Sequence, residues 1–214
     1  MKRYIILVIV VVTITSFSGC SNTMENNKSI NNKTVTSTKT SSTQENNDLN
    51  KSSENSSKDL EKSFKEPTDL KKPNIEEARN FEQSLKNGSV IMVSKDNSDK
   101  LEVYNISMLD KFLDSFNNHK EGYVRIIKGT LGKDGSILVN KFAEYETDGQ
   151  IIKNINYDTY ADKNNFEQGQ PTYSPKIAKT YPGDGVRYSI LESADTPDDM
   201  GATVISFNKS DIKN

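Results

Sequence analysis

The chain of 214 residues has one cysteine, one histidine and no tryptophan. A single cysteine leaves no partner for a disulfide inside a folded part, so packing alone has to stabilise it. A metal site needs three or four convergent ligands, and no His or Cys spacing of that kind exists. The missing tryptophan argues against a site that stacks sugar rings. A nucleophile elbow and a Gly-rich phosphate loop are also absent, so the sequence predicts no catalytic residue, no metal and no cofactor.

The chain also has no large excess of either positive or negative charge. Lysine and arginine total 28 and aspartate and glutamate total 30, and the two kinds are interspersed. A nucleic-acid-binding surface needs a basic patch or stripe, so we expect no nucleic-acid partner. No basic cluster follows the apolar N-terminus either, so attachment to a membrane would have to rest on lipid.

The N-terminus has the layout of a bacterial lipoprotein signal. Lys2 and Arg3 precede the apolar residues 4–14, and a Phe-Ser-Gly-Cys sequence ends at Cys20. The apolar run is shorter than the ~20 residues of a spanning helix but fits the ~7–15 residues of a signal segment. We expect residues 1–19 to be removed and Cys20 to carry the lipid anchor, which places the protein on the extracytoplasmic face of the membrane. The alternative is an ordinary secretory signal with an incidental cysteine, since Phe17 replaces the usual aliphatic residue.

Residues 20–72 are rich in Asn, Ser, Thr, Lys and Glu and contain few apolar side chains. Such a segment cannot bury enough apolar surface to offset the ~1–2 kcal/mol per residue that ordering the backbone costs. We therefore expect a disordered tether with a typical reach of ~40 Å. A helical turn over residues 57–65, where Leu60 and Phe64 are four apart, is the one local element that this segment suggests.

Two amphipathic helices are predicted in the single domain that we assign to residues 73–209, with residues 210–214 as a tail. Residues 75–86 follow an Asn74–Glu77 capping box and end at an Asn-Gly pair, and their apolar stripe is Ile75, Ala78, Phe81 and Leu85. The second helix begins at Ser107, where Asp110 completes the same capping pattern. Its apolar face consists of Met108, Leu109, Phe112, Leu113 and Phe116.

Most of the remaining domain reads as β-strand. A buried strand over residues 90–93 is followed by its return over residues 101–106, and further strands are expected over residues 123–128, 136–145, 150–160, 172–180, 186–192 and 202–208. Asp-Gly pairs favour tight hairpins because glycine adopts positive φ freely, and they occur at Asp134-Gly135, Asp148-Gly149 and Asp184-Gly185. The pattern predicts an α+β domain with one mainly antiparallel meander sheet and both helices on one face.

Several short segments of packing and turn residues stand out between residues 75 and 162. They are Asn-Gly-Ser-Val-Ile at 87–91, Leu-Asp-Lys-Phe at 109–112, Val-Arg-Ile-Ile at 124–127, Asp148-Gly149 and Tyr157-Asp158. Together they resemble an uncharacterised domain-of-unknown-function family of lipoproteins from Gram-positive, low-GC bacteria. The resemblance implies a location and a fold, and it carries no known activity. The resemblance ends after Asp162. In their last strands, members of the family often have a pair of cysteines, and this chain has Ser174 and Ser193 at roughly those places.

Acidic residues are the remaining candidates for chemistry. Glu144 and Glu146, spaced by two along a strand and therefore on one face, could act as an acid and a base, as could Asp158 and Asp162. A solvated outer face explains the two glutamates more simply. Two loops could offer carboxylates to calcium, but turn chemistry explains the same residues, which are Asp96, Asp99, Asp195, Asp198 and Asp199.

The single histidine and the tyrosines of the predicted strands are the last candidates. His119 falls at the C-terminal end of the second helix, where a surface cation is favoured by the helix dipole. Tyrosine offers contact area at a low entropic cost, yet we expect most of the strand tyrosines in the core or at its rim. They are Tyr123, Tyr145, Tyr157, Tyr160, Tyr173, Tyr181 and Tyr188.

The sequence therefore favours a non-catalytic binding or interaction module held outside the membrane by a lipid and a tether. The expected partner is a protein, a peptide or a cell-wall component that contacts exposed tyrosines and an open strand edge. A carboxylate-dependent envelope hydrolase and a structural envelope lipoprotein are the alternatives. A cleft with two carboxylates would favour the enzyme, and a flat or strand-edge surface would favour the module.

Overall fold

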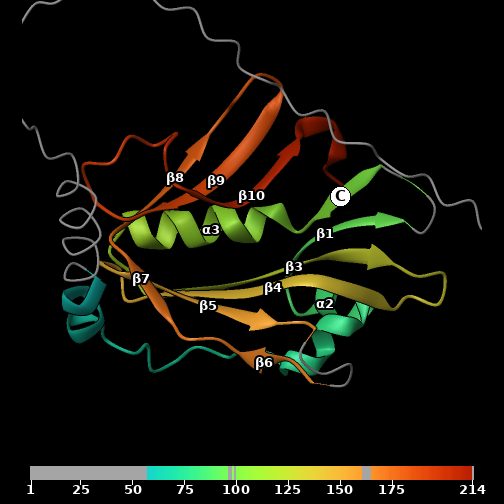
Figure 1. Cartoon of the computed structure of the whole chain (residues 1–214), viewed down its shortest axis with the longest axis horizontal. Helices are drawn as coiled ribbons and strands as arrows, with labels where there is room; N and C mark the ends of the chain where they lie inside the picture. The colour runs from blue at the N-terminus through green and yellow to red at the C-terminus, as the bar shows by residue number, and fades with distance from the viewer. Residues whose placement is uncertain (1–56, 96–97, 99, 161–164, 214) are drawn as a thin grey trace, which may run out of the picture. The chain divides into compact units, whose positions relative to one another are not determined.

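The computed structural model describes residues 57–95, 98, 100–160 and 165–213 (Figure 1). The predicted signal segment, Cys20 and tether residues 20–56 lie outside the described residues, as do Asp96, Asp99 and Asp162. Within the described part of the chain, no helix has the length and apolar character needed to cross a membrane. The fold is mixed α/β, with a large curled sheet, a second small sheet and few helices.

The large sheet contains seven strands in the order β2-β1-β3-β4-β5-β6, and β7 also pairs with β5. Its strands are β1 (Val90–Lys95), β2 (Leu101–Tyr104), β3 (Gly122–Leu131), β4 (Ile137–Thr147), β5 (Ile152–Asp158), β6 (Glu167–Gln168) and β7 (Thr172–Ser174). The β1–β3 pair is parallel, and the other pairs of this sheet are antiparallel. Parallel neighbours need a crossover connection, which α3 (Ile106–Asn117) provides.

A second sheet contains β8 (Lys176–Thr180), β9 (Gly185–Leu191) and β10 (Ala202–Asn208), which corrects the prediction of one meander sheet. The break falls at Ser174-Pro175. Because proline has no N–H for a strand ladder, the predicted strand over residues 172–180 divides into β7 and β8 there. The last three strands then leave the large sheet and fold over α3.

The helix α3 lies between the two sheets (Figure 1). Its predicted apolar face is confirmed, since Leu109 and Phe112 are buried and the other members pack against the same core. The predicted capping role of Asp110 is wrong: its carboxylate accepts hydrogen bonds of 2.6 Å from both Lys179 and Tyr188. Asp110 thereby joins the helix to the small sheet.

The opposite face of the large sheet is covered by η1 (Ile75–Arg79) and α2 (Phe81–Lys86). The prediction that both helices lie on one face of the sheet is therefore wrong. The predicted stripe from Ile75 to Leu85 is confirmed as part of this second core. The helix itself is interrupted at Asn80, whose side chain accepts a 2.9 Å bond from the backbone N–H of Gln83 and caps α2. A side chain that bonds the backbone competes with helix continuation.

Two of the three predicted Asp-Gly turns have glycine at positive φ, at Gly135 (80°) and Gly149 (90°). In the turn between β8 and β9 the positive φ occurs at Gly183 (58°) and not at Gly185. The sequence therefore places this hairpin correctly but assigns its turn to the wrong glycine.

Residues 57–72, which we call the strap, contact the large sheet although the sequence assigns them to the tether. Residues 57–63 are helical, and the Phe64 ring lies 5.6 Å from that of Tyr173. Farther along, Glu66 forms an ion pair with Lys153. The ordered chain thus begins before Pro73.

Candidate functional site

The predicted carboxylate pair lies on the η1 side of β4. Glu144 is 3% exposed and Glu146 is 1% exposed, so the interpretation of a solvated outer face is wrong. The strap and the start of η1 cover this part of the sheet, which no pattern in the sequence indicated. A buried carboxylate needs a cation and hydrogen bonds. Both residues have a cation, but only Glu144 has hydrogen bonds to both of its oxygens.

Arg125 on β3 neutralises Glu144. Its Nη2 and Nε donate to Oε1 of Glu144 at 2.6 and 3.1 Å. The same guanidinium donates to the backbone carbonyls of Asn74 at 2.9 Å and Pro73 at 2.6 Å. Arg125 is only 2% exposed, so it connects the end of the strap to the sheet from inside the protein.

Two tyrosines complete this arrangement, which we call the Arg125 cluster (Tyr123, Arg125, Glu144 and Tyr157). The hydroxyls of Tyr123 and Tyr157 donate to the two oxygens of Glu144 at 2.5 and 2.8 Å. Burial, together with the adjacent carboxylate, raises the pKa of both tyrosines, so both hydroxyls keep their protons. Every oxygen of Glu144 is occupied by an internal donor, which is the arrangement of a structural carboxylate.

Glu146 has a separate cation. Lys72 in the strap donates to its Oε1 at 2.6 Å, whereas its Oε2 is buried without a partner. Asp158 bonds the backbone N–H of Tyr160 at 2.8 Å, and its proposed companion Asp162 lies outside the described residues.

The other sequence candidates have ordinary surroundings. His119 is exposed, and its Nδ1 lies 3.0 Å from the carbonyl oxygen of Gly149, as a surface histidine at a helix end. Asp198 pairs with Lys176 at 2.8 Å. No group of three metal-binding side chains occurs among the residues that the structure describes. Of the seven strand tyrosines, only Tyr160 and Tyr181 are exposed, so the prediction that most lie in the core or at its rim is confirmed.

A groove on the opposite face of the large sheet is the feature that the sequence did not reveal. It consists of two adjacent cavities of about 170 and 340 Å³ between the large sheet and the β9–β10 side of the small sheet. Both cavities are lined by Asn154, Ile190 and Ala202. Ligand sites in proteins are typically of about 300–1,000 Å³, so the two together are large enough for a small molecule or one end of a larger one.

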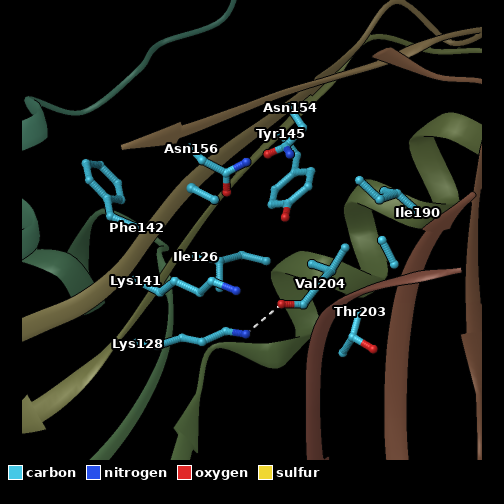
Figure 2. A pocket seen from close by; sticks show the side chains of 12 residues that line it. Ile126, Lys128, Lys141, Phe142, Tyr145, Asn154, Asn156, Ile190, Thr203 and Val204 are labelled. Atoms are coloured by element: carbon cyan, nitrogen blue, oxygen red, sulfur yellow. Dashed lines mark hydrogen bonds between the residues drawn. The ribbon is translucent and has the colours of Figure 1, made fainter. Parts of the chain in front are cut away.

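The smaller cavity is polar on the side of the large sheet. Figure 2 shows Lys128 and Lys141 side by side, with the hydroxyl of Tyr145 pointing into the cavity and Thr203 and Val204 on the opposite wall. The amino group of Lys128 donates to the backbone carbonyl of Val204 at 2.7 Å. Burial, and secondarily the charge of Lys141, lower the pKa of Lys128 from 10.5 to about 8.

Two β-bulges shape this cavity. In the β3–β4 pair the register shifts between Lys128 and Gly129, and in the β9–β10 pair it shifts between Thr203 and Ile205. Val204 is the bulged residue of the second pair, and its backbone carbonyl accepts the hydrogen bond from Lys128. Bulges redirect side chains and are frequent beside functional sites. A Cβ at Gly129 would lie 2.2 Å from the carbonyl oxygen of Leu138, so the first bulge requires glycine.

The larger cavity is lined on one side by the strap, through Ser57 and Leu60, and on the other by strands of both sheets. Its polar groups include the amide of Asn154, which is buried, donates weakly to Thr172 at 3.4 Å and has an Oδ1 without a partner. The carboxylate in the lining of the groove is Glu192. The signals of this groove in the sequence are limited to Asn154 and Asn156, two residues apart on β5, and to one lysine each on β3 and β4.

Comparison with known proteins gives no relative: no family model, no curated protein and no solved structure matches the chain. The resemblance to lipoproteins of Gram-positive bacteria therefore stays a prediction.

Proposed function

We propose that this chain is a lipid-anchored, extracytoplasmic binding module that takes its ligand in the groove between the two sheets. The observation that carries the proposal is the contrast in hydrogen bonding between the Arg125 cluster and the groove. The one carboxylate of the Arg125 cluster, that of Glu144, has both oxygens engaged by internal donors. In the groove, Asn154 keeps a buried oxygen without a partner, which a ligand can engage.

The groove suits recognition better than the acid-base chemistry of the alternative hydrolase. Its lining combines amides, hydroxyls, lysine amines and apolar side chains, with Glu192 as its carboxylate. Acid-base hydrolysis of glycosides or esters by carboxylates needs two of them, or a carboxylate with another base, at one cavity. A small number of oriented polar groups in a partly apolar groove is the usual composition of a ligand site.

A binding screen run beside an activity screen tests this function. The full-length chain, purified in mild detergent, is offered cell-wall glycan fragments, peptides and esters. We expect saturable binding without turnover. Reproducible turnover that is lost in Glu144→Gln would instead establish the hydrolase.

A blocking variant locates the binding. Ala202 is exposed and lines both cavities, so Ala202→Trp should fill their junction and abolish binding. Ser206→Trp is the matched control, because Ser206 is an exposed residue of the same strand that lines neither cavity. Equal binding by both variants would contradict the groove as the site.

The anchor has its own test. Cys20→Ser should release the protein from membranes, since acyl chains attached at Cys20 would supply the apolar contact at ~0.8 kcal/mol per buried methylene. Unchanged membrane fractionation, or lipid incorporation that persists in the variant, would contradict the anchor.

A further inference from the structure

We propose that the Lys128 end of the groove binds an anionic oxygen group of the ligand, a phosphate or a carboxylate. This inference rests on the proposed function, because it names the chemistry that the groove recognises. It starts from an unusual pair: Lys128 on β3 and Lys141 on β4 are direct cross-strand partners. Like charges in that position repel each other and destabilise a sheet.

Among the residues that the structure describes, no carboxylate pairs with either lysine to offset this repulsion. Among the ion pairs of the described residues, none includes Lys128 or Lys141. The smaller cavity has no carboxylate in its lining. Lys128 is half-buried, with the Val204 carbonyl as its hydrogen-bond partner. A partly desolvated cation next to a second cation gains most from a bound anion, which neutralises both.

Neutral polar groups around the lysines suit the rest of an oxyanion. The Tyr145 hydroxyl points into the cavity between the lysines and Asn154 (Figure 2). Asn156 and Thr203 also line this cavity, and both residues are exposed to solvent. Hydroxyl and amide groups donate to anionic oxygens, while the amide oxygen of Asn154 can accept from a hydroxyl of the same ligand.

The size of the cavity limits what enters this end. A volume of about 170 Å³ holds one phosphate or carboxylate with a few attached atoms, since each water in the liquid occupies ~30 Å³. The ligand would then continue past Asn154 into the larger cavity, where Leu60 and Tyr173 supply apolar contacts. The inferred ligand class is therefore a molecule with an anionic terminus and an uncharged, partly apolar body.

Calorimetric titration of the full-length chain with three small probes tests the charge requirement. The probes are inorganic phosphate, glycerol 3-phosphate and glycerol. We expect the two phosphates to bind and glycerol not to bind. Binding of glycerol as tight as that of glycerol 3-phosphate would overturn the inference. Vesicles with and without anionic lipid form a separate arm: vesicle binding that free glycerol 3-phosphate displaces identifies a lipid headgroup as the source of the phosphate.

Variants of the pair show where the anion sits. Lys128→Met and Lys141→Met should each weaken binding of glycerol 3-phosphate about tenfold or more, because each removes a charged hydrogen-bond donor. Lys133→Met is the matched control, since Lys133 is an exposed lysine of the same hairpin outside this cavity. Equal affinities in all three variants would mean that the anion binds elsewhere.

Thermal unfolding supplies a readout that separates a ligand-binding role from a structural one. Without phosphate, Lys141→Met should unfold at a higher temperature than the wild type, because the repulsion is gone. Phosphate should raise the unfolding temperature of the wild type and not that of Lys128→Met. If Lys141→Met is less stable than the wild type in the absence of phosphate, the pair is structural and the inference falls. If Ala202→Trp abolishes binding of a neutral ligand that both Met variants keep, the groove function stands and the anion inference falls.

Discussion

The two faces of the β3–β4 ladder use charge in opposite ways. Arg125 and Lys128 are three residues apart on one strand and face opposite sides of the sheet. Arg125 is buried against a carboxylate and two backbone carbonyls. Lys128 lies opposite another lysine and beside a cavity.

This difference separates structural charge from functional charge. A compensated buried ion pair adds little net stability, but removal of one partner is costly because the other charge is left in a dry environment. An uncompensated pair of cations costs stability in the free protein and recovers it when an anion binds. Substitutions on the two faces should therefore have opposite signs.

The largest effect is expected at Arg125. Arg125→Met leaves the buried Glu144 without a cation and removes the donors to Pro73 and Asn74, so the free energy of unfolding should fall by about 3–5 kcal/mol. Urea unfolding followed by circular dichroism measures it. A loss below about 1 kcal/mol would show that the Arg125 cluster is not a structural ion pair.

Lys72→Met should be the next in size, at about 2–3 kcal/mol. Its partner Glu146 is 1% exposed and would lose its ion pair. Two facts reduce the cost: Lys72 itself is 41% exposed, and Lys153 remains as the cross-strand neighbour of Glu146. The same urea titration applies, with Lys71→Met as the control because Lys71 is an exposed neighbour. Equal stability of the two variants would contradict the role assigned to Lys72.

The pH dependence of stability should reveal Lys128. Its pKa is about 8 when folded against 10.5 ordinarily, so between these values the unfolded chain binds more protons and rising pH favours the folded state. Relative to Lys128→Met, the wild type should gain about 1–2 kcal/mol as pH rises from 8 toward 10.5, after allowance for its partial exposure. Parallel pH profiles for the two proteins, measured by urea unfolding, would contradict an uncompensated cation.

Phe64→Ala should have the smallest global effect, below about 1 kcal/mol, because it removes a ring contact at the edge of the fold. Its local effect should be larger: limited proteolysis should cut residues 57–66 faster than in the wild type, since the strap loses its contact with Tyr173. Mass spectrometry of the fragments measures the cleavage sites. An unchanged cleavage pattern would show that the ion pairs alone hold the strap.

Local patterns in the sequence predicted most elements of the domain. The apolar stripes from Ile75 to Leu85 and from Met108 to Phe116 are both core-facing, because helix periodicity puts such residues on one side wherever the helix packs. Strand alternation and the Asp-Gly turns located the hairpins for the same local reason. The surroundings of the candidate site were predicted less well. Glu144 and Glu146 share a face of the sheet as predicted, but that face is buried.

The alternation of residues along β3 and β4 can be taken from the sequence alone, and it shows which residues share a face of the sheet. The tertiary structure decided which face each layer covers, because η1, the strap, α3 and the small sheet all come from segments far away in the chain. The cavity depends further on two bulges and on the position of β10, whose Val204 carbonyl reaches Lys128 across 76 residues of sequence. Periodicity records the side to which a residue points, whereas burial and charge compensation depend on what packs there, and only long-range contacts determine that.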